Sequence, residues 1–239
     1  MNILKYLNKE EFNPLQKGPI LFTMDADWSP DFILEEVLNM IPKGIYITLF
    51  ATNPSPVLDL FQERGHEIGA HPNFLPGSSH GEDSDEVLRC MRNYFPKAKG
   101  LRSHSLLQSS PIQNKISMAG FSYDCNLLLY MQNYIQPYQD WYGIIRVPYV
   151  WEDNVCLQAN KGYDTEYWLK QLSGPGLKIM NFHPLLITLN VNSSEAENYR
   201  ALKQAYTDLR NVPEEGFNSY RNAGKGIGTL FRELISRLA

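Results

Sequence analysis

Short apolar runs alternate with amphipathic segments along most of the chain. Residues 19–25 (PILFTMD) and 44–51 (GIYITLFA) are the first two runs, and both are rich in β-branched or aromatic residues. Runs of this length, bounded by Gly, Pro or Asn, predict buried β-strands. Four more follow at residues 101–107, 120–126, 143–151 and 177–185, and His66 stands at the turn into a further short strand.

Helical patterns lie between these runs. Residues 30–41 place their apolar positions on one face, and residues 56–65 begin after Ser55, a good cap, and end at Gly65. Residues 85–95 follow Ser84, which we expect to cap that helix. Further helices are expected at residues 110–120, 193–210 and 225–238.

The repeated order of strand and helix is typical of an α/β fold with a mainly parallel sheet covered by helices. No linker or internal repeat interrupts the pattern, so we expect one domain over residues 1–239. Its motif-bearing core spans about 18–190, and C-terminal helices occupy 193–239. In such folds the chemistry gathers at the carboxyl ends of the strands.

Composition narrows the class of protein. The 239 residues are 43% hydrophobic and 20% charged, which argues against a disordered chain. The net charge of −4 and the lack of a Lys/Arg cluster argue against a nucleic-acid partner. No apolar run is long enough for a membrane span, and the first residues do not resemble a signal peptide. Three scattered cysteines suit a reducing compartment, so a cytoplasmic location is expected. The oligomeric state is not indicated.

Acidic, imidazole and guanidinium side chains stand just past successive predicted strands. They are Asp25 and Asp27, His71 and His80, Arg102 and His104, Asp124, Glu152 and Asp153, and His183. The carboxyl ends of parallel strands meet at one rim, so these groups should converge. Carboxylates and imidazoles together suit a divalent metal of the zinc, cobalt or iron type, with zinc the first expectation.

Four passages of the chain resemble polysaccharide deacetylases of the NodB-homology, carbohydrate esterase type. The passage GHEIGAH (65–71) is the specific part of the likeness. ILFTMDADW (20–28), LRSH (101–104) and IMNFHP (179–184) stand where that family has its aspartate, arginine and late histidine motifs. The resemblance implies a distorted (β/α) barrel of six or seven mainly parallel strands with outer helices. The passages HPNFLPGSSHGED, WED and NFHP resemble members from bacterial O-antigen gene clusters more than secreted chitin or xylan esterases.

The resemblance also implies roles for the residues that match the motifs. Asp25 would be the general base, held ionised by Arg102, and His183 would be the general acid, oriented by Asp153 or Glu152. Asp27 and His71 would bind the metal, whereas His66 would be structural. Trp28 and Trp151 would stack on a sugar, with Asp153 also near the substrate, although both tryptophans could equally be core aromatics.

The sequence departs from the family pattern at three places. Ala26 separates the two aspartates, Leu75 stands where the family has its second metal histidine, and Arg102 is followed by Ser-His. A third ligand must therefore come from elsewhere or be absent. We expect His80, because a turn at residues 76–77 can fold it back beside His71, with Asn73 and His104 as competitors.

The function expected from these observations is metal-dependent hydrolysis of an N-acyl group, N-acetyl in the first instance, on a sugar in bacterial surface-polysaccharide biosynthesis. The sugar could be nucleotide- or lipid-linked. One alternative is a C–N hydrolase of a small amide or cyclic ureide. Another is a non-catalytic carbohydrate-binding protein, which the broken aspartate and histidine spacings would suit.

Overall fold

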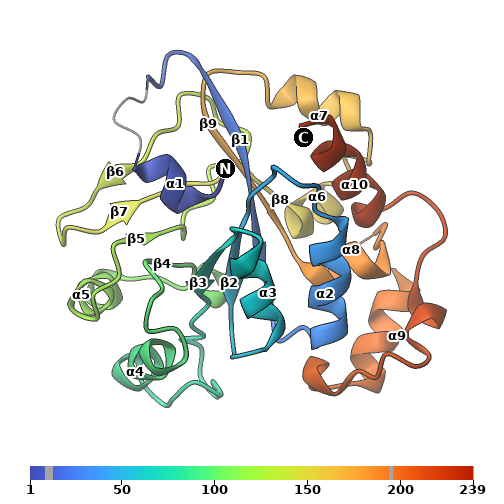
Figure 1. The fold of residues 1–239 in the computed structure, drawn as a ribbon, viewed down its shortest axis with the longest axis horizontal. Helices are drawn as coiled ribbons and strands as arrows, with labels where there is room; N and C mark the ends of the chain where they lie inside the picture. Colours follow the sequence, from blue (N-terminus) through green and yellow to red (C-terminus); the bar gives the residue numbers. More distant parts are fainter. Residues whose placement is uncertain (9–12, 194–195, 239) are drawn as a thin grey trace.

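A computed structural model describes residues 1–8, 13–193 and 196–238 (Figure 1). Among these residues nine strands form one sheet in the order β6-β7-β5-β4-β3-β2-β1-β9-β8. The strands are β1 (Lys17–Asp25), β2 (Thr48–Ala51), β3 (Glu67–Ala70), β4 (Gly100–Leu101), β5 (Tyr123–Asp124), β6 (Tyr138–Gln139), β7 (Ile145–Arg146), β8 (Trp151–Glu152) and β9 (Gly176–Phe182).

All neighbouring strands run parallel except β6 and β7. The expected α/β fold with a mainly parallel sheet is therefore confirmed. The expected number of strands, six or seven, is too small. The predicted strand at residues 143–151 is in fact two strands, β7 and β8, on either side of Pro148, which cannot donate a backbone hydrogen bond.

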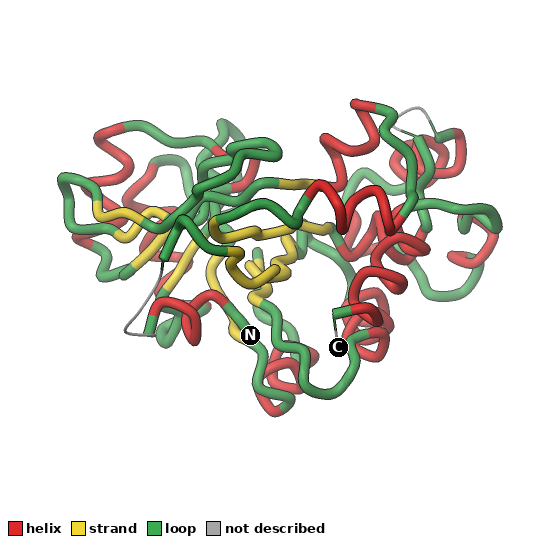
Figure 2. The backbone as a smooth tube through the Cα atoms, turned by 90° about the horizontal axis from the view of Figure 1, so that it is seen from above, coloured by secondary structure: helices red, strands yellow, loops and turns green. Residues whose placement is uncertain are grey.

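The sheet curls, with helices around its outside, but its ladder does not close into a full barrel (Figure 2). β6 and β8 are its two edges in the described residues. An irregular segment lies along the β8 side, where the amides of Leu129 and Met131 donate to the carbonyls of Tyr149 and Val150 at 2.8 Å each. This segment takes the place that a closing strand would occupy.

Two layers of apolar side chains pack on the two faces of the curled sheet. Leu21, Phe50 and Ile179 belong to an inner cluster, whereas Phe22 and Met24 pack in a larger outer cluster with the helices. Consecutive residues of β1 thus enter different clusters, as the alternation of side chains along a strand requires. This alternation also places Thr23 and Asp25 on the inner side, above the inner cluster.

The N-terminal helix α1 (Ile3–Leu7) lies at the amino ends of the strands, opposite the expected site. Glu67 holds it there: one carboxylate oxygen accepts from the Leu4 amide at 2.9 Å and from Thr48 Oγ1 at 2.8 Å. The other oxygen accepts from the Tyr123 hydroxyl at 2.6 Å. Burial raises the pKa of Glu67, and these three hydrogen bonds to the carboxylate partly offset that effect. The sequence patterns did not predict this helix.

The helices follow the predicted pattern over much of the chain. Predicted segments match α2 (Asp31–Met40), α3 (Val57–Glu63), α5 (Ser110–Met118), α9 (Glu197–Ala205) and α10 (Ile227–Arg237), and α4 (Ser84–Tyr94) begins one residue before its predicted segment. Residues 194 and 195, near the start of the helix predicted at 193–210, lie outside the described residues. Asp83 rather than Ser84 caps α4, because its carboxylate accepts from the amides of Asp85 and Glu86. Besides α1, the unpredicted α-helices in the described residues are α6 (Asp153–Ala159), α7 (Thr165–Gln171) and α8 (Pro184–Leu189).

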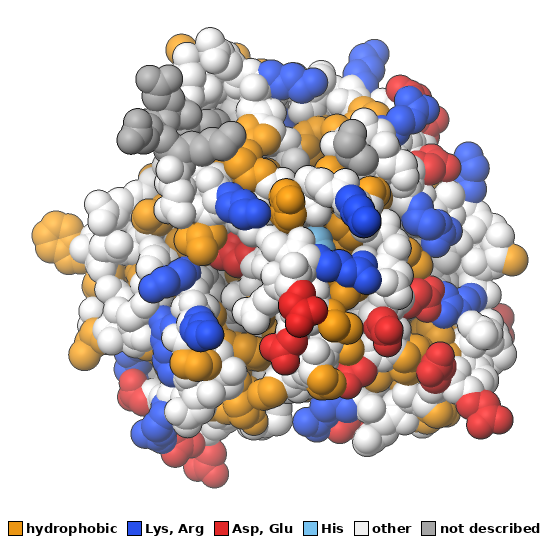
Figure 3. Space-filling model, viewed as in Figure 1, with side chains coloured by type: hydrophobic (Ala, Val, Ile, Leu, Met, Phe, Trp, Pro, Cys, Tyr) orange, Lys and Arg blue, Asp and Glu red, His pale blue; other side chains and the backbone are white. Residues whose placement is uncertain are grey.

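None of the described helices combines the length and apolar character that crossing a bilayer requires. On the face shown in Figure 3, Lys and Arg side chains are interspersed with Asp and Glu. A hydrophobic group protrudes at its left edge, where the β6–β7 hairpin lies, and Trp141 on this hairpin is 94% exposed.

His66 lies in the core of the fold, at the entrance to β3. Its Nδ1 accepts a hydrogen bond from the Ile47 amide at 3.2 Å, and its ring packs against Phe61. Burial, together with the nearby charges of Arg64 and Lys5, lowers the pKa of His66 to about 4. The folded protein therefore favours a neutral imidazole at this position.

We expect Gly176→Ala to destabilise the protein more than Gly162→Ala. Both glycines have a positive φ (+89° and +75°), so both variants carry the left-handed strain, which is about 1–2 kcal/mol. A Cβ at Gly176 would lie 2.5 Å from the Ile135 amide nitrogen, whereas a Cβ at Gly162 would meet nothing within 4 Å. The clash should add about 1–3 kcal/mol, measured as the free energy of unfolding in urea. Equal losses in the two variants would contradict the close approach at Gly176.

We expect His66→Asn to make stability less sensitive to acid. The Asn oxygen can replace Nδ1 as the acceptor, but it does not titrate. In the wild type the folded pKa of about 4 lies below the unfolded value of about 6.5. The unfolded state therefore binds more protons between these values, and stability falls as the pH falls through this window. Between pH 7 and pH 4 the wild type should lose about 1–3 kcal/mol more than the variant. Parallel stability curves would refute this account of His66.

Candidate active site and metal centre

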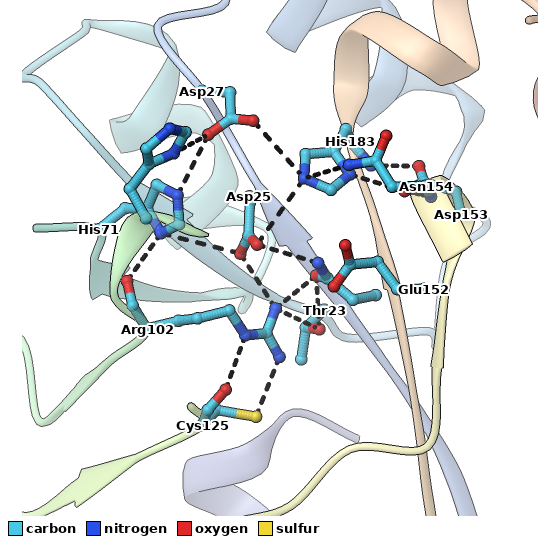
Figure 4. A network of polar contacts seen from close by, with 12 residues as sticks. Thr23, Asp25, Asp27, His71, Arg102, Cys125, Glu152, Asp153, Asn154 and His183 are labelled. Atoms are coloured by element: carbon cyan, nitrogen blue, oxygen red, sulfur yellow. Dashed lines mark hydrogen bonds and ion pairs between the residues drawn. The ribbon is translucent and has the colours of Figure 1, made fainter. Parts of the chain in front are cut away.

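Arg102 is a fully buried guanidinium directly after β4, and the site is built around it (Figure 4). Its Nη1 donates to Asp25 Oδ1 and Thr23 Oγ1 at 3.0 Å each, and also to Asn181 Oδ1. Its Nε donates to the Cys125 carbonyl at 2.9 Å, and Nη2 contacts the Cys125 sulfur. Each of the three guanidinium nitrogens thus has an acceptor, which is the condition for burying a charge without a prohibitive cost.

Asp25 ends β1, and both of its carboxylate oxygens are engaged. Oδ1 accepts from Arg102, and Oδ2 accepts from Asn181 Nδ2 at 2.9 Å. Burial favours the protonated acid, but the positive charges of Arg102, His71 and His183 outweigh it and lower the pKa of Asp25. The predicted contact between Asp25 and Arg102 is therefore present, and it keeps the carboxylate ionised and fixed in orientation.

Asp27 lies beyond the end of β1 and faces two imidazoles. Its Oδ1 is 3.1 Å from His71 Nε2 and 3.0 Å from His104 Nδ1. The ligand atoms of these three residues all lie within 4.8 Å of one another, and no other group of three potential ligand residues in the described chain does so. Burial raises the pKa of Asp27, but the contacts with His104 and His71 lower it more strongly. Asp27 is therefore a carboxylate.

The chemistry of these three residues suits a divalent metal. His71 Nδ1 lies 2.7 Å from the Arg102 carbonyl, an acceptor only, so Nδ1 carries a proton and Nε2 is the ring nitrogen that faces Asp27. Burial lowers the pKa of His71, but Asp25 and Asp27 raise it more strongly, so a metal would have to displace the proton from Nε2. One carboxylate and two imidazoles are a common ligand set for catalytic zinc, which leaves a further position open. The side chains of Asp27 and His104 are about a quarter exposed, at 25% and 26%, so the cluster is accessible from solvent.

His183 follows β9 and is held by Asp153, the first residue of α6. Asp153 Oδ1 lies 2.6 Å from His183 Nδ1, and Oδ2 accepts from the His183 amide at 2.6 Å. Nε2 therefore faces the two aspartates, 3.9 Å from Asp25 Oδ2 and 3.5 Å from Asp27 Oδ2. Burial lowers the pKa of His183, but the negative charges of Asp153, Asp27 and Asp25 raise it well above its usual value. The imidazole thus holds a proton at neutral pH.

The structure places His104, and not the expected His80, in one cluster with Asp27 and His71. His80 Nδ1 accepts a hydrogen bond from the Asn73 amide at 3.0 Å, and its ring stacks on Trp28. The loop of residues 72–80 does fold back as expected, but it turns His80 onto the tryptophan. Asn73, the other competitor, accepts from the Leu75 amide and so stabilises the same loop.

Two expected substrate contacts are also corrected. Trp151 is fully buried between Trp168 and Phe182, so it belongs to the core and cannot stack on a sugar. Asp153 is likewise inaccessible, with 0% exposure, and it contacts His183 rather than solvent. Asp153, not Glu152, is therefore the residue that orients His183. Trp28 is partly exposed beside His104, and its role in binding a substrate stays a prediction.

Unusual backbone geometry supports two of the three metal-ligand candidates. Asp27 and the following Trp28 have positive φ angles of 44° and 56°. Ser105 and Leu106, directly after His104, have φ angles of 55° and 54°. Non-glycine residues pay on the order of 1 kcal/mol or more for such conformations, which persist where the surroundings enforce them.

The sequence patterns did not predict Asn181 and Thr23 as site residues. Both accept hydrogen bonds from Arg102, and the Thr23 hydroxyl also donates to Asn181 Oδ1. A signal for both was present in the strand period. Thr23 precedes Asp25 by two residues, and Asn181 precedes His183 by two, so each shares the inward side of its strand. His104 had a similar signal two residues after Arg102.

We expect His71→Ala and His104→Ala to lose bound metal and His80→Ala to keep it. The purified, folded variants would be loaded with Zn²⁺, desalted and analysed for metal by mass spectrometry. His66→Ala is not a suitable control, because His66 accepts a core hydrogen bond. Asn73→Ala serves instead, because it alters the His80 loop without removing an imidazole. Loss of zinc from His80→Ala, with retention in His104→Ala, would restore His80 as the ligand.

Comparison with known proteins places this geometry in context. The polysaccharide deacetylase family described as WbmS-like matches residues 22–203. No curated protein sequence gives a significant match. A crystal structure from Bordetella bronchiseptica, described as a candidate polysaccharide deacetylase involved in O-antigen biosynthesis (WbmS), is 31% identical with a TM-score of 0.82. The match covers 94% of this chain and 92% of that one.

More distant structures share less of the fold. A candidate polysaccharide deacetylase from Mycobacterium smegmatis is 16% identical with a TM-score of 0.47, over 73% of this chain and 79% of that one. A peptidoglycan N-acetylglucosamine deacetylase is 15% identical with a TM-score of 0.42, over 71% and 73%. Neither similarity is close enough to support an inference about function. The match over residues 22–203 and the Bordetella structure together place this chain in the WbmS-like polysaccharide deacetylase family.

Proposed function

We propose that this protein is a metal-dependent deacetylase that hydrolyses an N-acyl group, N-acetyl in the first instance, on a sugar of a bacterial surface polysaccharide. One observation carries the proposal. An ionised, oriented carboxylate (Asp25) and a protonated, oriented imidazole (His183) face each other beside a set of metal-ligand candidates. Family membership alone would be compatible with a protein that had lost one of these parts.

The surroundings of Asp25 suit a general base. Its two hydrogen bonds, from Arg102 and Asn181, hold the carboxylate plane fixed, and its lowered pKa keeps it ready to accept a proton. A water molecule beside it would give up a proton to Asp25 as its oxygen attacks the acyl carbon. Arg102, fully buried and bonded to Asp25, would keep the base in place through the reaction.

The surroundings of His183 suit a general acid. Asp153 binds Nδ1, so the proton available for transfer is on Nε2, the nitrogen that faces Asp25 and Asp27. As the tetrahedral intermediate collapses, this proton would pass to the departing amine nitrogen and complete the hydrolysis. The proposal therefore needs Asp153 as a positioning residue, although it never touches the substrate.

Asp27, His71 and His104 would hold the metal, with zinc the first candidate. When bound, such an ion supplies Lewis-acid polarisation of the acyl oxygen and a water of lowered pKa. The carbonyl of Arg102 would fix the His71 ring so that Nε2 remains the ligand atom.

The substrate class in the proposal draws on the Bordetella protein, which is described as involved in O-antigen biosynthesis. The proposal includes a cytoplasmic location for the enzyme. A nucleotide- or lipid-linked N-acetylated sugar would be a suitable substrate there. The completed set of base, acid and ligand candidates favours an enzyme over a non-catalytic carbohydrate-binding protein. His104 would fill the ligand position that has no histidine at Leu75, and the broken histidine spacing would then no longer favour a non-catalytic protein.

We expect Asp25→Asn to retain zinc and to lower the rate of acetate release by about 10²- to 10⁴-fold, the usual worth of a positioned base. Acetate would be measured enzymatically with a panel of free, nucleotide-linked and lipid-linked N-acetyl sugars. Asp140→Asn is the matched control. Asp140 accepts hydrogen bonds from the amides of Tyr142 and Ile144 in the β6–β7 hairpin, and an Asn oxygen can keep both.

The results separate the alternatives. Activity of Asp25→Asn within tenfold of the wild type would remove Asp25 as the base. Release of ammonia or formate from small amides, without acetate from any sugar, would favour the C–N hydrolase. Zinc binding with no hydrolysis of either panel would favour the binding protein.

A further inference from the structure

The loop that carries His104 is clamped at both ends by one buried residue, Asn126. Before His104, the Ser103 amide donates to Asn126 Oδ1 at 2.6 Å. After it, Gln108 Nε2 donates to the Asn126 carbonyl at 3.3 Å. Asn126 is 1% exposed and follows β5, so the clamp belongs to a different βα unit from the loop.

A second layer of polar contacts fixes Asn126 and the far end of the loop. Asn126 Nδ2 donates to Asp124 Oδ2 at 3.4 Å, and Asp124 Oδ1 accepts from Arg146 Nε at 2.7 Å. Arg146 Nη2 also donates to Gln108 Oε1 at 2.5 Å. These contacts link the loop to β5 and β7. The three metal-ligand candidates make none of the hydrogen bonds in this network.

The loop needs such a clamp because its backbone is strained. Ser105 (φ 55°, ψ 22°) and Leu106 (φ 54°) are consecutive non-glycine residues in the left-handed region. Ser105 is exposed, so packing of its side chain does not explain the conformation. The His104 amide also donates to the Pro72 carbonyl at 2.8 Å. Loss of the Asn126 contacts on both sides of the turn would let its strained angles relax, and the His104 imidazole would move away from Asp27.

We propose that Asn126 is a positioning residue for the metal centre, which holds His104 in its ligating place by opposing the strain at Ser105 and Leu106. This inference rests on the metal site of the proposed function. It does not depend on the reaction or on the substrate. It explains how His104, on an irregular loop, could serve as the ligand that the family has at the position of Leu75.

The test measures zinc affinity in the full chain, by competition with a chromophoric chelator, with Zn²⁺ alone as the probe. Asn126→Ala should bind zinc about 10- to 100-fold more weakly than the wild type, the range found for residues that orient metal ligands. Adding Ser105→Gly should recover several-fold of that loss, because glycine adopts a positive φ without strain. Adding Ser105→Ala should recover none, because alanine keeps the penalty.

A merely structural role for Asn126 would not produce this difference between glycine and alanine at a residue that it does not contact. Zinc affinity of Asn126→Ala within twofold of the wild type would overturn the proposal, as would equal effects of the two Ser105 substitutions. A wild type that binds no zinc would overturn the metal site itself, and with it the inference. A wild type that binds zinc, beside an unaffected Asn126→Ala, would overturn the inference alone.

A single variant keeps the test decisive if Asn126→Ala does not fold. Ser105→Gly in the otherwise wild-type, metal-free protein should raise the melting temperature by a few degrees, because it removes the strain at an exposed position. The Ser105→Ala protein should show no such gain. An unchanged or lower melting temperature for Ser105→Gly would show that the turn stores no strain, and the proposal would fail.

Discussion

The burial of the Arg102 guanidinium is the constraint on which the rest of the site depends. A cation without solvent must find a hydrogen-bond acceptor for nearly every N–H group, and here the acceptors come from β1, β9 and the chain after β5. Two aromatic rings, those of Phe50 and Tyr149, lie below it at 4.7 and 4.5 Å. The curvature of the sheet brings these separate strands within reach of one side chain.

This arrangement links stability to chemistry. Asp25 neutralises Arg102, and Arg102 in turn helps to keep Asp25 ionised, so removal of the Asp25 charge would leave the buried guanidinium without its counter-charge. Cys125 takes part as a neutral group, because burial raises the pKa of its thiol to about 11 in spite of the nearby guanidinium. The base of the proposed reaction is therefore also a structural element of the inner core.

Much of this organisation was predictable from the sequence, and the exceptions have physical causes. Strand period and strand-end positions were sufficient to bring Asp25, Asp27, His71, Arg102 and His183 to one rim. Trp151 could not be assigned in the same way, because an apolar aromatic at a strand end has the same pattern whether it faces solvent or core. The choice of His104 over His80 depended on backbone conformation. Left-handed angles at Ser105 and Leu106 and the stacking of His80 on Trp28 have no signature in residue type. Helix α8 could not be predicted because all of its residues are buried. A buried helix and a buried strand both appear in the sequence as a continuous apolar run.

The three metal-ligand candidates stand at positions 27, 71 and 104, on three different βα units. Two histidines four residues apart can chelate an ion even in a collapsed or unfolded chain, because a short loop closes at little entropic cost. Here the smallest separation is 33 residues, counted from His71 to His104, so the unfolded ensemble has almost no preformed chelate. An ion that binds only the native state adds its full binding free energy to folding. In this protein the availability of metal would therefore act as a thermodynamic control on how much of the chain is folded, quite apart from any part that the ion takes in catalysis.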